Sequence, residues 1–478
     1  MKKIFILLLN ALLTASIAYG QDYRNKLEQV MQDYHQFNMF DGAVLVAQEG
    51  KVIYKGAFGM ANREWNIPNS TDTKFMIGSI SKPLTAILML IQVEKGLIDL
   101  NKPVSAYLPE FLGKPAGNVT ISQLLSHTSG IPNYDIMKDF FPRISRQQFK
   151  REEYVKLYAD SALIFEPGSK YYYSSWGYFT LGYIMERVTG KSYSQLMKED
   201  LFDKIGMTSS GSYYHTQVVP KRATGYDYNL GGYSSSDFRD QTNTMGTGDI
   251  YSTVEDLFKL HQAIADHSLI SPELTAAMLK PGIPPANYGY GWFNKNFKLT
   301  TSDSVVSNFH LGMTEGFLSF ILRIPDKNRL IVILCNSSPT DFFGIAGSLA
   351  KVIYDMPVQV KAPVHKEMER IIIAENAMAA VNAYQRMKLD TANYYIDWIS
   401  MDFLSNQLLN LKRLEDARIV TDNNSVEFPN KDLVMVTSGN IYNALGMTKE
   451  AIKFYEKALK LNPLYEEAKN RLKELSKK

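Results

Sequence analysis

Gly78-Ser79-Ile80-Ser81-Lys82-Pro83 determines how the rest of this sequence is interpreted. Pro83 is typical of the first turn of a helix, and residues 85–92 carry an apolar face. Ser79 is therefore expected at a helix N-terminus, with Lys82 one turn further along the same face. A serine hydroxyl attacks a carbonyl only if another group takes its proton, and a lysine three residues on can reach it. Ser79 is thus the candidate nucleophile.

Lys82 can serve Ser79 only in a particular environment. Free lysine has a pKa of about 10.4 and is charged at neutral pH. Burial or a positive helix terminus must therefore favour the neutral form of Lys82, or another group must take the proton. The same Ser-x-x-Lys pattern recurs at Ser348 to Lys351, where no glycine turn or helix start accompanies it. We interpret Ser348 as a surface position on a helix.

Apolar runs on both sides of this region predict a sheet. Residues 43–47 and 52–54 are expected to form one hairpin, and residues 317–324 and 330–334 a second. The long region between the hairpins is rich in helix and loop signals. Terminal strands that enclose a helical middle predict an α+β fold, with one antiparallel sheet assembled from both ends of the segment.

Two further groups of residues accompany Ser79. The first is Pro167-Gly168-Ser169-Lys170-Tyr171-Tyr172-Tyr173-Ser174-Ser175-Trp176-Gly177-Tyr178, and the second is His310-Leu311-Gly312. With them the chain resembles the serine β-lactamase and penicillin-binding family, in the branch of class C β-lactamases, D-alanyl-D-alanine carboxypeptidases and related esterases. The resemblance covers about Phe37 to Asn336 and extends to three further blocks, at residues 124–132, 248–257 and 289–292. It implies an antiparallel sheet flanked by helices, with the active site beside an all-helical lobe.

The resemblance implies a role for each site residue. Ser79 would be the nucleophile, Lys82 its hydrogen-bonded partner, and Tyr173 the phenolate-like base and later the acid. The backbone N–H groups of Ser79 and Met313 would form an oxyanion hole, in which each donor contributes about 10²- to 10³-fold. Gly312 would be glycine because substrate lies against the backbone there. The tyrosine's usual pKa of about 10 would have to be lowered by positive neighbours.

Three points qualify this assignment. The three consecutive tyrosines at 171–173 allow another register, although the flanking glycines favour Tyr173. Many relatives have Tyr-x-Asn at the second motif, whereas this chain has Ser175, so the amide that would hold a substrate amide is missing. His310 stands where β-lactamases commonly have lysine, and it weakens the fixed positive charge that would bind a β-lactam carboxylate. We therefore expect a peptidase or esterase rather than an efficient β-lactamase.

Residues 1–20 are expected to be a secretory signal peptide, because Lys2 and Lys3 precede an apolar run and small residues frame a cleavage site. No later stretch is apolar over about 18 residues, so no membrane association is expected after cleavage. The expected location is periplasmic or secreted. With 52 basic and 49 acidic residues the chain gives no reason to expect a nucleic-acid partner. Cys335 is the single cysteine and is expected to be a buried thiol on a strand.

The region after the expected hydrolase domain, residues 21–356, has a different composition. We expect a helical linker at 357–400 and tetratricopeptide-like repeats at 401–478, because four pairs of residues recur 34 positions apart. These pairs are Asn406 and Asn440, Leu411 and Leu445, Ala417 and Ala451, and Pro429 and Pro463. Two repeats fall short of the three or so that a solenoid needs, so the tail is expected to pack on the preceding helices or on the catalytic domain. A protein partner would bind through these repeats.

Other mechanisms have less support in the sequence. His127 lies in a Ser/Thr/Gly turn and is expected to be structural rather than a triad base. Neither a His-Glu-x-x-His metal site nor a Gly-x-Ser-x-Gly nucleophile turn occurs, and no cofactor is expected. The prediction is acyl transfer to water from a small-molecule or peptide substrate: a D-amino-acid peptide, a cell-wall-like peptide or a carboxylic ester. The alternative is a non-catalytic ligand-binding or sensor protein, which Ser175 favours and the retention of Ser79 with Lys82 and Tyr173 opposes.

Overall fold

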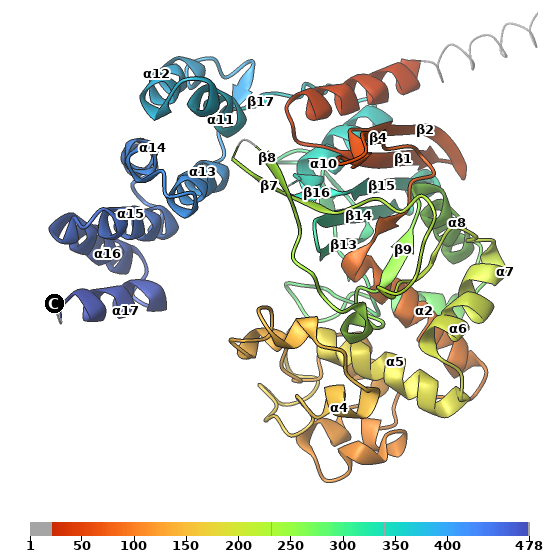
Figure 1. Ribbon diagram of the computed structural model, residues 1–478. Coiled ribbons are helices and arrows are strands. Elements are labelled where there is room, and N and C mark those ends of the chain that lie inside the picture. Colours follow the sequence, from red (N-terminus) through yellow and green to blue (C-terminus); the bar gives the residue numbers. More distant parts are fainter. Residues whose placement is uncertain (1–21, 231, 339, 477–478) are drawn as a thin grey trace, which may run out of the picture. The chain divides into compact units, whose positions relative to one another are not determined.

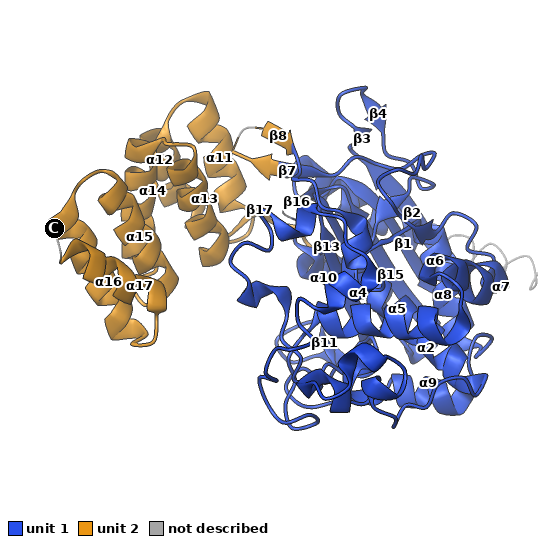
Figure 2. Ribbon diagram, turned by 60° about the horizontal axis from the view of Figure 1, so that its bottom comes forward, with its two compact units in different colours: residues 1–227, 235–358 blue, residues 228–234, 359–478 orange. Residues whose placement is uncertain are grey.

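The computed structural model describes residues 22–230, 232–338 and 340–476, so the expected signal peptide at 1–20 lies outside the described residues. The chain divides into two compact units (Figure 2). Unit 1 comprises the residues up to 227 and residues 235–358, and unit 2 comprises residues 228–234 and 359–478. The hydrolase motifs all fall in unit 1.

Unit 1 is built on a six-stranded sheet in the order β10-β13-β14-β15-β1-β2, in which every neighbouring pair is antiparallel (Figure 1). The pairing of β1 with β15 joins the two ends of the unit, because Gly42 of β1 lies opposite Cys335 of β15. This confirms the predicted sheet. The strands are β1 (Gly42–Gln48), β2 (Lys51–Phe58), β10 (Phe293–Asn294), β13 (Asn308–Thr314), β14 (Phe317–Ile324) and β15 (Arg329–Cys335).

Both faces of the sheet are covered. On one face, alternate residues of β15 join the main hydrophobic core, which includes Leu257 and Leu260 of helix α8 (Val254–Ala265). On the other face, Phe320 of β14 stacks on Phe342 of helix α10 (Phe342–Ile353), with ring centroids 6.1 Å apart. Burial on two sides explains why β14 and β15 are buried along their whole length and mostly apolar rather than alternating. Cys335 is buried on β15 as predicted.

The segment between β2 and β13 supplies the helical lobe. Its long helices are α2 (Ser81–Glu94) and α5 (Ser175–Thr189), and residues 81–92 of α2 are all buried, as expected of a helix inside a core. The shorter helices are α3 (Ile121–Leu125), α4 (Arg151–Val155), α6 (Tyr193–Leu196), α7 (Asp203–Ile205) and α9 (Pro272–Met278). Small strands complete unit 1: β3 (Met60–Asn62), β4 (Ile67–Pro68), β5 (Phe75–Met76), β6 (Gly211–Ser212), β9 (Ile250–Ser252), β11 (Phe297–Lys298), β12 (Ser304–Val305) and β16 (Ser337–Ser338).

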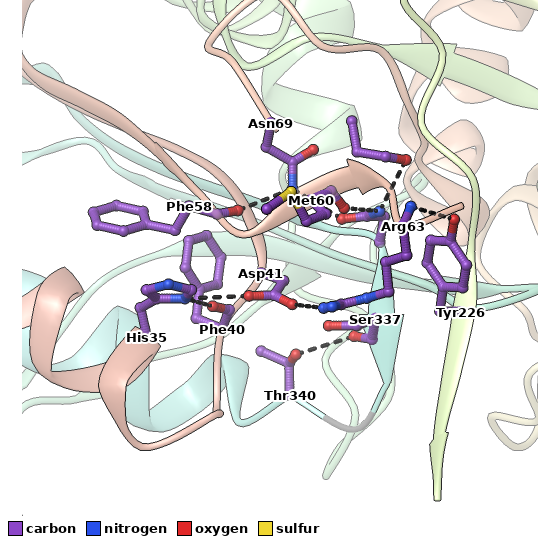
Figure 3. Close-up of polar contacts among 12 residues, drawn as sticks. His35, Phe40, Asp41, Phe58, Met60, Arg63, Asn69, Tyr226, Ser337 and Thr340 are labelled. Atoms are coloured by element: carbon purple, nitrogen blue, oxygen red, sulfur yellow. Dashed lines mark hydrogen bonds and ion pairs between the residues drawn. The ribbon is translucent and has the colours of Figure 1, made fainter. Parts of the chain in front are cut away.

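A polar cluster fixes the entry of the chain into this sheet (Figure 3). Asp41, just before β1, forms ion pairs with Arg63 and with His35 of the helix at 22–36, the latter at 3.2 Å. The backbone N–H of Arg63 donates to the hydroxyl of Tyr226, 2.8 Å away on β7 (Tyr226–Asn229). Asp41 also raises the pKa of His35 through their hydrogen bond. The cluster thereby joins segments far apart in the sequence.

Unit 2 is helical, with α11 (Val364–Ala374), α12 (Ala377–Met387), α13 (Trp398–Asn410), α14 (Leu414–Glu427), α15 (Asp432–Ala444), α16 (Thr448–Leu461) and α17 (Glu466–Leu475). It also contains the second half of β7, all but the last residue of β8 (Gly232–Ser235), and the short pair β17 (Ala362–Pro363) and β18 (Tyr394–Tyr395). Ala417 and Ala451 are completely buried at matching positions of α14 and α16, in agreement with the 34-residue period. The segment at 357–400 contains α11 and α12, which share one hydrophobic core with α13 and α14. The repeats therefore pack on the preceding helices. None of the described helices is long and apolar enough to cross a membrane.

Candidate active site

Ser79 lies in a short 3-10 turn, η1 (Gly78–Ile80), that leads directly into α2. Gly78 has a φ of +49°, and a Cβ at this position would approach the backbone N of Met313 to 2.7 Å. Glycine is therefore required at 78, and the backbone amide of Met313 lies beside the Gly78–Ser79 peptide. The turn leaves Ser79 partly exposed, although both of its neighbours are buried.

Lys82 is completely buried on the first turn of α2. Its Nζ donates to Ser79 Oγ at 3.1 Å and to the carbonyl oxygen of Thr247 at 2.9 Å. Burial lowers the pKa of Lys82 to about 7, and the negative charge of Asp249 counteracts part of this effect. Desolvation therefore meets the requirement, inferred from the sequence, for a neutral amine beside the serine.

The loop at 246–249 holds Lys82 through the carbonyl oxygen of Thr247. Asp249 is buried, and its Oδ1 accepts from the backbone N–H of Gly246 at 2.9 Å, which fixes the loop that presents the Thr247 carbonyl. Burial raises the pKa of Asp249 to about 6. The sequence marks residues 248–257 as a family block but indicates no role for Thr247 or Asp249.

Tyr173 lies just before α5, where Ser174 caps the helix by accepting from the backbone N–H of Gly177 at 3.2 Å. Lys82 Nζ lies 4.8 Å from the centroid of the Tyr173 ring. Burial raises the pKa of Tyr173 well above its usual value of 10, and a hydrogen bond with the Ser79 side chain offsets only part of that rise. The expected lowering of this pKa is therefore wrong, and Tyr173 is a neutral phenol.

His127 packs against Tyr173. Its ring centroid lies 4.3 Å from that of Tyr173, and its Nδ1 accepts from the backbone N–H of Ser174 at 3.1 Å. Burial holds the pKa of His127 well below its ordinary value, so the imidazole stays neutral. These contacts agree with the structural role expected from the sequence.

Ser175 is the first residue of α5 and is buried near Ser79. Its backbone N–H donates to Oδ1 of Asn133 at 2.9 Å. The side chain of Ser175 lines the same cavity as Ser79, in the place where the resemblance expects an amide.

β13 carries His310, Gly312 and Met313, of which only Met313 lines the Ser79 cavity. A Cβ on Gly312 would collide with the carbonyl oxygen of Ile77 and with Ser319 Oγ, which themselves are hydrogen-bonded at 2.7 Å. The sequence led us to expect glycine at 312 because substrate lies against the backbone there. In the structure, the atom nearest to a Cβ at this position belongs instead to the backbone of Ile77, which precedes the nucleophile turn. The side chain of Met313 is 72% exposed, so its backbone amide rather than its side chain adjoins the nucleophile turn.

His310 is buried rather than presented to substrate as a charge. Its Nε2 lies 3.0 Å from the hydroxyl of Tyr288, and its Nδ1 lies 2.7 Å from the carbonyl oxygen of Leu311. Burial, together with the charge of Lys82, lowers the pKa of His310 to about 3. A neutral imidazole at this position supplies no fixed positive charge.

The cavity at Ser79 is walled by both aromatic and polar side chains. Ser79, Ser175 and Met313 line it with Tyr134, Phe140, Tyr154, Trp176, Phe179, Arg239, Asn243, Thr244, Thr247, Gly248 and Thr314. Arg239 and Asn243 could not be recognised from the sequence, since neither lies in a motif. Among the described residues, no group of three or more His, Cys, Asp or Glu could hold a metal ion. Ser348 lies on α10 away from this cavity, and its partly buried hydroxyl is 3.0 Å from that of Tyr34.

Comparison with known proteins agrees with this geometry. The family model described as Beta-lactamase matches residues 24–353, which is more than half of the chain. The chain belongs to the β-lactamase family. Membership of this family of serine hydrolases confirms the resemblance drawn from the motifs. The model described as Tetratricopeptide repeat matches residues 438–465, within α15 and α16 and just beyond.

Individual members of the β-lactamase family show how far the similarity extends. A penicillin-binding protein of Bacillus subtilis is 28% identical over 374 residues, which cover 73% of this chain and 81% of that protein. A teichoic acid D-alanine hydrolase of Staphylococcus aureus is 31% identical over 267 residues, which cover 55% of this chain and 64% of that protein. The chain thus spans slightly less than two thirds of the Staphylococcus protein. The crystal structure of a penicillin binding protein from Bacillus halodurans has 26% identity and a TM-score of 0.58, and the match covers 68% of this chain and 99% of that one.

Proposed function

We propose that this chain is an exported serine hydrolase that transfers an acyl group to water through an ester on Ser79. The observation that carries the proposal is the 3.1 Å contact between Lys82 Nζ and Ser79 Oγ, at an amine whose pKa burial lowers to about 7. About half of such amines are neutral at pH 7, so Lys82 can accept the serine proton without a cofactor.

The proposed reaction uses three side chains. Neutral Lys82 takes the proton of Ser79 as Oγ bonds to the substrate carbonyl carbon, and the backbone N–H groups of Ser79 and Met313 stabilise the oxyanion. As the bond to the leaving group breaks, the Tyr173 hydroxyl donates a proton to the departing atom and recovers one from the Lys82 ammonium. Water then attacks the acyl ester, which releases the acid and restores Ser79. This assigns Lys82 as base and Tyr173 as acid, because burial keeps Tyr173 protonated.

The proposed substrates are amides or esters of D-amino acids, including cell-wall-like peptides and D-alanyl esters, together with simple carboxylic esters. The similarity to a teichoic acid D-alanine hydrolase supports this class. Neutral His310 supports a peptidase or esterase rather than an efficient β-lactamase, since a β-lactam carboxylate would find no fixed positive charge there.

Export is proposed from the charged and apolar pattern of residues 1–20, with release of the mature chain into the periplasm or the exterior. Sequencing the N-terminus of the protein recovered outside the cytoplasm tests this, and a start near Gln21 is expected. The repeats of unit 2 are proposed to bind a protein, because tetratricopeptide arrays present extended surfaces.

Labelling with a fluorophosphonate probe tests the proposed chemistry. The mature chain is expected to react once, Ser79→Ala to be unreactive, and Ser348→Ala to react like the parent. Ser348 is the matched control because it also begins a Ser-x-x-Lys pattern on a helix. A folded protein that takes no label would instead favour the ligand-binding or sensor alternative.

A further inference from the structure

Asn243 is a buried amide in the wall of the Ser79 cavity, on the short helix η8 (Gln241–Thr244). Only 5% of the residue is exposed. Its Nδ2 donates to the carbonyl oxygen of Gln147 at 2.6 Å. Its Oδ1 is buried and accepts from no group in the part of the chain that the structure describes, residues 22–230, 232–338 and 340–476. An acceptor on a residue that lines the Ser79 cavity is therefore unused.

The orientation of this amide is fixed by its neighbour. Rotating the side chain by half a turn would place Oδ1 against the Gln147 carbonyl, and two acceptors would then face each other. The backbone around Asn243 is also held, because Asp240 caps η8 by accepting from the backbone N–H of Thr242 at 2.9 Å. A buried acceptor left unpaired is costly, so its retention in a preformed wall indicates a ligand that supplies the donor.

The remainder of the cavity indicates what kind of donor fits. Aromatic side chains share its walls with hydroxyl and amide groups, and the aromatic faces suit a small apolar group or the positive end of an N–H bond. Arg239, a cation in the wall, forms an ion pair with Glu315 at 2.9 Å, so its charge is already compensated. Ser175, which lines the same space, is too short to replace the amide that the resemblance leads one to expect there.

We propose that Asn243 Oδ1 accepts a hydrogen bond from an N–H group on the α-carbon of the substrate acyl group, so that the cavity selects aminoacyl or acylaminoacyl substrates. The inference rests on the proposed acyl transfer at Ser79 and specifies its substrate class. Asn243 supplies from η8 the amide acceptor that position 175 lacks. It is a specificity-determining residue that touches substrate but takes no part in proton transfer.

The test compares three methyl esters with the mature full-length chain: those of D-alanine, N-acetyl-D-alanine and (R)-2-methoxypropanoic acid. The last carries an ether oxygen where the others carry N–H, and so offers an acceptor but no donor. Asn243→Ala is expected to lower kcat/KM for both N–H esters by about tenfold to a hundredfold, as loss of a buried hydrogen-bond partner does. For the methoxy ester kcat/KM is expected to stay the same or to rise.

For each ester, kcat/KM of the parent is divided by that of the variant, and this ratio is then compared among the three esters. Intrinsic ester reactivity cancels in the ratio, and a general loosening of the cavity changes all three ratios alike. Asn294→Ala is the matched control, because Asn294 is a buried asparagine that donates to the Lys280 carbonyl at 3.3 Å but lies outside the Ser79 cavity. It is expected to affect all three esters alike. Equal losses on all three esters in Asn243→Ala would overturn this inference alone. Failure of every ester, with no fluorophosphonate label on Ser79, would overturn the proposed function as well.

Discussion

Lys82 Nζ donates to Ser79 Oγ across 3.1 Å and to the carbonyl oxygen of Thr247 across 2.9 Å. The amine thus has a fixed position, and burial rather than a second cation lowers its pKa. These two contacts come from one helix turn and from a loop 165 positions further along the chain. The basicity of Lys82 is therefore a property of the tertiary fold.

Lys82→Arg is expected to lower the second-order rate of fluorophosphonate labelling by about 10²- to 10⁴-fold. Arginine keeps a positive charge but does not deprotonate in proteins, so it cannot take the serine proton. Labelling followed by intact-mass spectrometry measures the rate. A variant that labels within about threefold of the parent would show that Lys82 acts only as a fixed charge.

The labelling rate should depend on pH through Lys82. Because its folded-state pKa is about 7, the neutral fraction and the rate are expected to rise as pH passes through 7. The charge of Asp249 raises the pKa of Lys82, so Asp249→Asn is expected to move this rising limb of the pH–rate profile to lower pH. Asparagine retains an oxygen for the Gly246 N–H and leaves the loop bonded. A limb that stays in place or moves to higher pH would refute the coupling.

Tyr173→Phe isolates the hydroxyl from the ring. The ring packs 4.3 Å from His127 and should keep that contact, so the melting temperature is expected to change little. The rate of ester hydrolysis is expected to fall by about 10²- to 10⁴-fold because the leaving group loses its proton donor. Full activity in this variant, measured by release of the alcohol, would assign the acid role to another group.

Gly312→Ala tests the structural reason for this glycine. The added methyl group meets the Ile77 carbonyl and Ser319, so the variant is expected to be destabilised by about 1–3 kcal/mol, as overpacked cores are, and to lose labelling at Ser79. Gly347→Ala is the control, since no atom lies within 4 Å of a Cβ built there and alanine favours the helix α10. Thermal and urea unfolding give the two stabilities. If Gly312→Ala were as stable as the parent and lost only substrate turnover, the original reason, contact with substrate, would be restored.

The features that could be predicted are those whose residue pattern lies within a short stretch of the sequence or repeats along it. The turn at Gly78, the helix that follows, the apolar strands at both ends of unit 1 and the 34-residue period could all be recognised from spacing and residue type. Their agreement with the structure follows because each pattern buries a definite face.

The parts that could not be predicted depend on tertiary packing. Asn243, Thr247 and Asp249 lie in a segment without periodicity, and only the fold brings them to Ser79 and Lys82. The direction of the Tyr173 pKa shift could not be predicted for the same reason, since it follows from burial that no motif records. The reason for Gly312 likewise lies in a contact with Ile77, which is far away along the chain.

The most direct measurement is the mass of the covalent intermediate. The mature chain is mixed with the methyl ester of N-acetyl-D-alanine, quenched in acid within the first turnovers and digested for peptide mapping. We predict one N-acetylalanyl adduct, located on Ser79, which is absent from Ser79→Ala and accumulates more slowly in Lys82→Arg. An adduct on another residue, or continued hydrolysis by Ser79→Ala, would contradict the account.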